Sequence, residues 1–251
     1  MAKFTLILIR EATRLLGLFR RCPLLAHTLT VAVPDREISA WLHYNEVAFR
    51  EFSDQAELSG TVLTNHTNQI SGYEDHLKKI TEFVQSSGTL VLQEPEYGVT
   101  GLKTLQVLED LSLLIQYWRE PDRSCCDSYV FPAAENSVLW RNIPEDHLQM
   151  LNSAVGGEIV SQHQVRPSKP FRMLAAWNMH LREPAVMEIP YGEGMVIESR
   201  IQVRGRLIPI HRYTDFYDRR YNPVAERYFR NLITNDYHHD RKNLRELILS
   251  Q

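Results

Sequence analysis

The first part of the chain alternates short apolar, β-branched runs with longer stretches of helical periodicity. The runs lie at residues 27–33, 60–65 and 89–93, and apolar side chains recur at helical spacing over residues 35–58, 71–87 and 102–118. Parallel strands need connections of this length, because a tight hairpin joins only antiparallel strands. Nearly continuous apolar strands are typical of a sheet covered on both faces. We therefore predict an α/β fold, with a Rossmann-like parallel sheet and flanking helices.

The pattern changes in the second part of the chain. A predicted helix begins at Pro144 and ends near Val155, and strand-like segments separated by short Pro/Gly turns then fill residues 157–211. Such spacing is typical of antiparallel hairpins. Helices are expected at residues 223–234 and 241–250. We predict a Rossmann-like α/β domain at residues 1–177 and a C-terminal extension of hairpins and helices at residues 178–251, packed on the same core.

The sharpest local signal is the start of the second predicted helix. Ser71 and Glu74 form a capping box, in which each side chain can bond the backbone N–H of the other residue. The apolar residues that follow share one helical face and are predicted to be buried: Tyr73, Leu77, Ile80 and Val84.

Composition excludes several classes of protein. The chain has 251 residues and a formal charge of −3, so no global charge points to nucleic acid or an anionic membrane. No apolar stretch approaches the ~20 residues of a membrane span.

Three cysteines, two of them adjacent (Cys125 and Cys126), argue against a disulfide framework or a metal site. We predict a cytoplasmic protein without a metal. The Arg-rich start of the chain is interpreted as a core element with solvated arginines, with a transit peptide as the alternative.

Polar residues follow each of the three predicted parallel strands. In an open α/β sheet, ligands bind beyond the carboxyl ends of the strands. The residues at these ends are Asp35, then Asn65, His66 and Asn68, then Glu94, Glu96 and Tyr97. His66 has the unperturbed pKa best suited to proton transfer near neutrality. Each residue also has an ordinary structural explanation, as a helix cap, a turn former or a solvated carboxylate.

A second candidate lies near the C-terminus. Residues 204–230 contain seven arginines interleaved with tyrosine and phenylalanine. Arginines mixed with aromatic side chains can bind nucleic acid. They also fit a helix that packs its aromatic residues inward and keeps its arginines in water, and we favour this interpretation. The chain has no GxGxxG, Walker, GxSxG or HExxH motif.

Residues 60–177 resemble, in the order of their elements, the C-terminal half of a class I SAM-dependent methyltransferase. GTVLTNHTNQI resembles the fourth strand of that fold, GTLVLQEPEYG the fifth, and GEIVSQHQVRPSKPFRMLAAW the closing antiparallel pair. The glycine-rich cofactor loop of the family is missing, since residues 1–33 contain only Gly17.

The resemblance implies a methyltransferase-like protein that uses S-adenosyl-L-methionine to modify a small molecule. Its expected residues are His66 as the catalytic base, Asp35, Asn65 and Glu94 for the cofactor, and Asn68, Glu96 and Tyr97 for the substrate. The missing glycine loop favours an alternative, a catalytically inactive subunit that binds a protein partner. A further alternative is an RNA- or DNA-binding module that uses residues 204–230.

Overall fold

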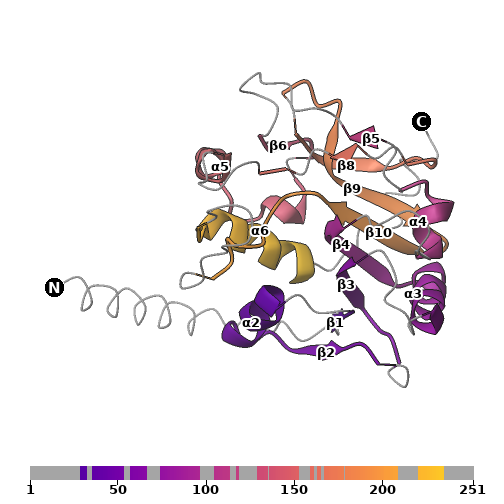
Figure 1. The fold of residues 1–251 in the computed structure, drawn as a ribbon. Helices are drawn as coiled ribbons and strands as arrows, with labels where there is room; N and C mark the ends of the chain where they lie inside the picture. The colour runs from indigo at the N-terminus through magenta and orange to yellow at the C-terminus, as the bar shows by residue number, and fades with distance from the viewer. Residues whose placement is uncertain are drawn as a thin grey trace.

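A mixed sheet forms the centre of the protein. The structure is a computed structural model, which describes residues 29–32, 36–53, 57–66, 74–96, 105–113, 117–118, 129–134, 136–152, 159–160, 163–164, 167–177, 179–208 and 220–234. The eight strands run in the order β2-β1-β3-β4-β10-β9-β8-β6 (Figure 1). This order is open, with β2 at one edge and β6 at the other.

Five neighbouring strands of this sheet are parallel. They are β2 (Phe49–Glu51), β1 (Leu29–Val31), β3 (Thr61–His66), β4 (Thr89–Glu96) and β10 (Gly194–Ser199). The parallel pairing predicted for the first three apolar runs is confirmed. The sequence did not indicate that β10, from the second part of the chain, would pair in parallel with β4.

The remaining strands of the sheet are antiparallel. They are β9 (Pro184–Tyr191), which pairs with β10, then β8 (Arg172–Ala176) and β6 (Phe131–Pro132). The predicted succession of parallel strands followed by antiparallel strands is therefore confirmed. A separate two-stranded sheet pairs β5 (Tyr117–Trp118) with β7 (His163–Gln164).

Helices cover both faces of the sheet (Figure 1). One face packs against α2 (Arg36–Tyr44), α5 (Glu145–Asn152) and α6 (Pro223–Thr234), with the short η1 (Val138–Trp140) beside them. The other face packs against α3 (Glu74–Ser86) and α4 (Gln106–Asp110). Side chains alternate along each strand, so Leu63 of β3 joins the first core and Val62 joins the second.

The predicted buried stripe of α3 is confirmed where the structure describes it. Ile80 and Val84 are buried in the core on the second face, and Leu77 packs against it while half-buried. Tyr73 and the Ser71 end of the capping box lie outside the described residues.

Two predicted helices are wrong in length. The helix predicted over residues 35–58 ends at Tyr44, because Glu46 has a left-handed φ of 55° and the Val47 N–H bonds back to Leu42 O at 3.0 Å. Phe49 then begins strand β2. The helix predicted over residues 102–118 is reduced to α4, which ends before Ser112, where φ is again 55°. Apolar spacing alone did not reveal either turn.

Several predictions lie outside the described residues. These are the three cysteines, the arginine-rich start of the chain and the helix at residues 241–250. In the part of the chain that is described, no helix is long and apolar enough to cross a membrane.

Candidate functional site

The strand order reverses between β1 and β3. From β1 the chain passes through α2 to β2 on one side, whereas β3 lies on the other side of β1 and leads to α3. The helices after these two adjacent strands cover opposite faces of the sheet, α2 one and α3 the other. In open α/β sheets this arrangement leaves a crevice at the carboxyl ends of the two strands, where ligands bind.

The structure brings part of the predicted rim together. Strands β3 and β4 are adjacent and parallel, so their carboxyl ends share one edge. His66 and Glu96 are Cα partners across these strands, and Asn65 is buried beside them, with 2% of its surface exposed. The side chains of His66 and Glu96, and all of Asp35, Asn68 and Tyr97, lie outside the described residues.

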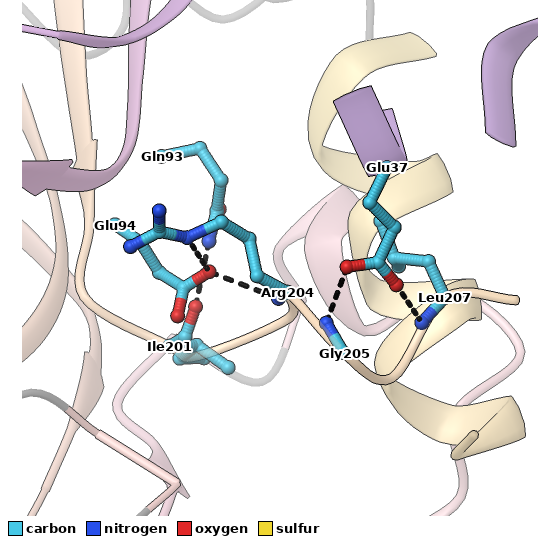
Figure 2. Close-up of polar contacts among 7 residues, drawn as sticks. All are labelled: Glu37, Gln93, Glu94, Ile201, Arg204, Gly205 and Leu207. Atoms are coloured by element: carbon cyan, nitrogen blue, oxygen red, sulfur yellow. Dashed lines mark hydrogen bonds and ion pairs between the residues drawn. The ribbon is translucent and has the colours of Figure 1, made fainter. Parts of the chain in front are cut away.

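Glu94 has a structural partner that the sequence pattern did not reveal. Its φ is 44°, a left-handed conformation that a glutamate rarely adopts. Its carboxylate accepts hydrogen bonds from the backbone N–H of Arg204 at 2.9 Å and from Arg204 Nε at 3.3 Å (Figure 2). This irregular end of β4 is thereby tied to a turn 110 residues further along the chain.

A second carboxylate holds the same turn. Glu37, in the first turn of α2, accepts hydrogen bonds from the N–H of Gly205 and, at 3.2 Å, from the N–H of Leu207 (Figure 2). Gly205 has a φ of 78°, which favours glycine over any residue with a side chain. Together Glu37 and Glu94 fix the turn at residues 204–207, which we call the carboxylate-bound turn.

More buried charge lies where β10 ends. Glu198 and Arg200 are almost fully buried, with 3.8 Å between Glu198 Oε1 and Arg200 Nε, and Arg206 is fully buried. Buried charges are tolerated only when opposite charges and hydrogen bonds compensate for the lost hydration. The carboxylates of Glu37, Glu94 and Glu198 match the guanidinium groups of Arg200, Arg204 and Arg206 in number, so this edge carries no net charge from them.

Asn65 is a neutral side chain buried at the same edge. Its side-chain Nδ2 is buried, and among the described residues it has no hydrogen-bond partner. A buried amide donor without a partner costs about 1–3 kcal/mol. Native structures keep few such groups, and each calls for an explanation such as a ligand or a bound water. The sequence singled out Asn65 by its place after an apolar strand, but burial without a partner is visible only in the structure.

The arginine- and aromatic-rich segment is in part a core element. On α6, Tyr228 and Phe229 are fully buried, and Arg230 lies over the Trp41 ring with 5.2 Å between its Cζ and the ring centroid. Burial raises the pKa of Tyr228, whose hydroxyl lies 2.8 Å from Ser199 Oγ. These aromatic side chains are therefore not available for stacking on bases. Residues 209–219 lie outside the described part.

Comparisons with known proteins give a distant likeness of fold. No protein-family model and no curated protein matches the chain. Among solved structures, an exo-beta-1,4-mannosidase from Opitutaceae bacterium strain TAV5 is 13% identical, with 70% of this chain and 31% of that chain covered and a TM-score of 0.39. A beta-galactosidase from Rahnella sp. R3 is 14% identical, with 81% and 30% covered and a TM-score of 0.42. This chain thus spans under a third of the length of each of those two enzymes.

The resemblance to a methyltransferase is wrong. The solved structures that this chain is similar to are glycoside hydrolases, which include a beta-galactosidase from Bacillus circulans sp. alkalophilus at 11% identity and a TM-score of 0.42. The strand pairing disagrees with the resemblance as well. The supposed closing pair at residues 157–177 does not form, because β7 pairs with β5 in the small sheet while β8 lies between β9 and β6. S-adenosyl-L-methionine was expected only through this resemblance, and we do not propose it.

Proposed function

We propose that this chain is a Rossmann-like binding module that holds a small polar molecule at the carboxyl edge of β1, β3 and β4. The observation that carries the proposal is the buried Nδ2 of Asn65, which lacks a partner among the described residues beside the point where the strand order reverses. A hydrogen-bond acceptor on a ligand would satisfy this group and remove its cost.

The charges around the site limit the kind of ligand. Glu94 is engaged with Arg204, and the three carboxylates of this edge are matched by three guanidinium groups. No group of three or more His, Cys, Asp or Glu residues in the described part could hold a metal ion. The proposal is therefore a ligand held by hydrogen bonds. His66 and Glu96, and with them Asp35, Asn68 and Tyr97, are proposed as further contacts because they follow the same strands.

A titration followed by NMR tests this proposal. The probes are phosphate, acetate, acetamide, D-ribose and D-glucose, and the readout is the set of backbone amide signals. We expect at least one probe to shift the signals of residues 64–66 and 93–96, while those of Gln85 and Gly194 at the opposite edge stay in place. Shifts spread evenly over both edges, or no shifts with any probe, would contradict the proposal.

The variant Asn65→Leu sharpens the test. It replaces the amide by an apolar group of similar size, so we expect binding to weaken while the ligand-free protein becomes more stable by about 1 kcal/mol. Gln85→Leu is the matched control, because it removes an amide that bonds Tyr191 OH at 3.0 Å at the opposite edge and should leave binding unchanged. Loss of stability in Asn65→Leu would mean that Asn65 is an ordinary structural residue.

A further inference from the structure

Three polar side chains lie in a row across the carboxyl end of the parallel sheet. Ser199 of β10 and Gln93 of β4 are Cα partners. Asn65 of β3 lies between Thr64, which pairs with Leu92, and His66, which pairs with Glu96, so the irregular stretch of β4 that begins with Gln93 lies opposite it. We call Asn65, Gln93 and Ser199 the polar row. On the same face, the residues two positions earlier along these strands, Leu63, Val91 and Ile197, belong to the apolar core.

The polar row lies on the face of the sheet that α2, α5 and α6 cover. The Ser199 hydroxyl contacts Tyr228 of α6, and Gln93, as the partner of Ser199, shares its face. Leu63, two residues before Asn65, packs in the core of the same face, so the alternation of a strand places Asn65 there too.

Two members of the row have complementary unsatisfied groups. Gln93 is fully buried, and its Nε2 donates to Ile201 O at 2.6 Å (Figure 2), but its Oε1 has no hydrogen-bond partner among the described residues. Asn65 Nδ2, on the adjacent strand, is a hydrogen-bond donor that is also buried without a partner among the described residues. Neighbouring strands lie about 4.8 Å apart, a spacing that one small group can bridge.

The chemistry of this pair selects among ligands. An anion would accept from Asn65 but would meet the Gln93 oxygen with a like partial charge. A cation would have the reverse conflict, and an apolar group would satisfy neither side chain. A hydroxyl group satisfies both with a single atom, because it accepts one hydrogen bond and donates another.

We infer that the ligand of this edge is a neutral, hydroxyl-rich molecule such as a sugar or another polyol, with one hydroxyl held between Asn65 Nδ2 and Gln93 Oε1. The inference rests on the proposed function and adds the class of ligand to it. Ser199 and Tyr228 close the row on the side of β10 and already bond each other, so they are not counted as ligand contacts.

The test follows the side-chain NH₂ signals of Asn65 and Gln93 in the full chain. The probes are D-ribose, D-glucose and glycerol, compared with acetate, phosphate and acetamide. We expect the hydroxyl compounds to shift both signals together. Asn65→Leu and Gln93→Leu should each weaken sugar binding roughly 2- to 10-fold, the loss of one hydrogen bond, and Gln85→Leu should not. Since Gln93→Leu also removes the bond to Ile201, Asn65→Leu remains informative if the Gln93 variant folds poorly.

Each other outcome overturns the inference in a recognisable way. If acetate, phosphate or acetamide moves these signals and the sugars do not, the class of ligand is wrong and the proposed function stands. If sugars bind Asn65→Leu as tightly as the native chain, the hydroxyl is not held by this pair. If no probe moves either signal, a bound water fills the position, and the inference and the proposed function fail together.

Discussion

The two ends of the parallel strands are built differently. At the amino end, Tyr191 donates to Asp110 and accepts from Gln85, and the turn between β9 and β10 packs directly on the end of α3. At the carboxyl end, Glu94 has a left-handed φ and Asn65 has a buried amide without a partner among the described residues. The amino end is organised for stability, while the carboxyl end keeps strain and unsatisfied groups. Such features persist in folded proteins mainly where a site needs them.

A substitution at Gly194 tests the close packing of the amino end most directly. A Cβ there would lie 2.0 Å from Val84 O and 2.3 Å from Gly88 O, both backbone atoms, the first within α3 and the second just beyond its end. We expect Gly194→Val to lower the free energy of unfolding by about 3 kcal/mol or more, measured by chemical denaturation. Glu193→Ala, at an exposed position of the same turn, is the control and should change it little. Equal effects would show that the turn does not pack as described.

At the carboxyl end, the largest effect is expected at Glu94. Its carboxylate is nearly buried and neutralises Arg204, whose side chain is 19% exposed. Glu94→Gln leaves the guanidinium without this charge, so we expect a loss of about 2–3 kcal/mol, less than for a fully buried pair. The matched control is Lys78→Ala, which removes an exposed pair with Glu82 at 3.7 Å and should cost less than about 0.5 kcal/mol. Similar losses in both variants would mean that the carboxylate-bound turn is not held by charge.

Tyr191, at the amino end, makes the stability of the protein depend on pH. Burial, and next the hydrogen bond to Asp110, raise the pKa of Tyr191 from 10.0 to about 12. Because the folded-state pKa lies above the unfolded one, this tyrosine contributes stability that is complete below about pH 10 and is lost as the pH rises toward 12. Tyr191→Phe should cost about 1 kcal/mol at neutral pH and should lose less stability than the native chain between these pH values.

The control for this pH experiment is Tyr129→Phe, which alters a partly exposed tyrosine away from this edge. It should leave the alkaline loss of stability as it is in the native chain. The same hydrogen bond, from the Tyr191 hydroxyl to the Asp110 carboxylate, lowers the pKa of Asp110. A Tyr191→Phe variant with the same alkaline profile as the native chain would show that the Tyr191–Asp110 bond does not couple to folding.

The sequence predicted the elements that depend on local pattern. The apolar runs at β1, β3 and β4 and the periodic stripe of α3 fixed an α/β sheet with helices between parallel strands. Where the pattern failed, a turn interrupted an apolar stretch. Phe49 and Phe52 continue the spacing of α2, yet Glu46 turns the chain and Phe49 forms β2 beside β1. A left-handed residue other than glycine leaves no sequence signal of this kind.

The same distinction between local pattern and tertiary structure applies to the candidate site. Sequence alone placed Asn65 and Glu94 at the carboxyl ends of parallel strands, because that rule needs only the order of strands and helices. The tertiary structure decided that Glu94 binds Arg204 and that Glu37 binds the same turn, across separations of 110 and 168 residues. It also decided that Asn65 Nδ2 and Gln93 Oε1 are buried without a hydrogen-bond partner among the described residues. Local pattern reports which face of an element is apolar, but whether a buried polar atom finds a partner depends on segments that only folding brings together.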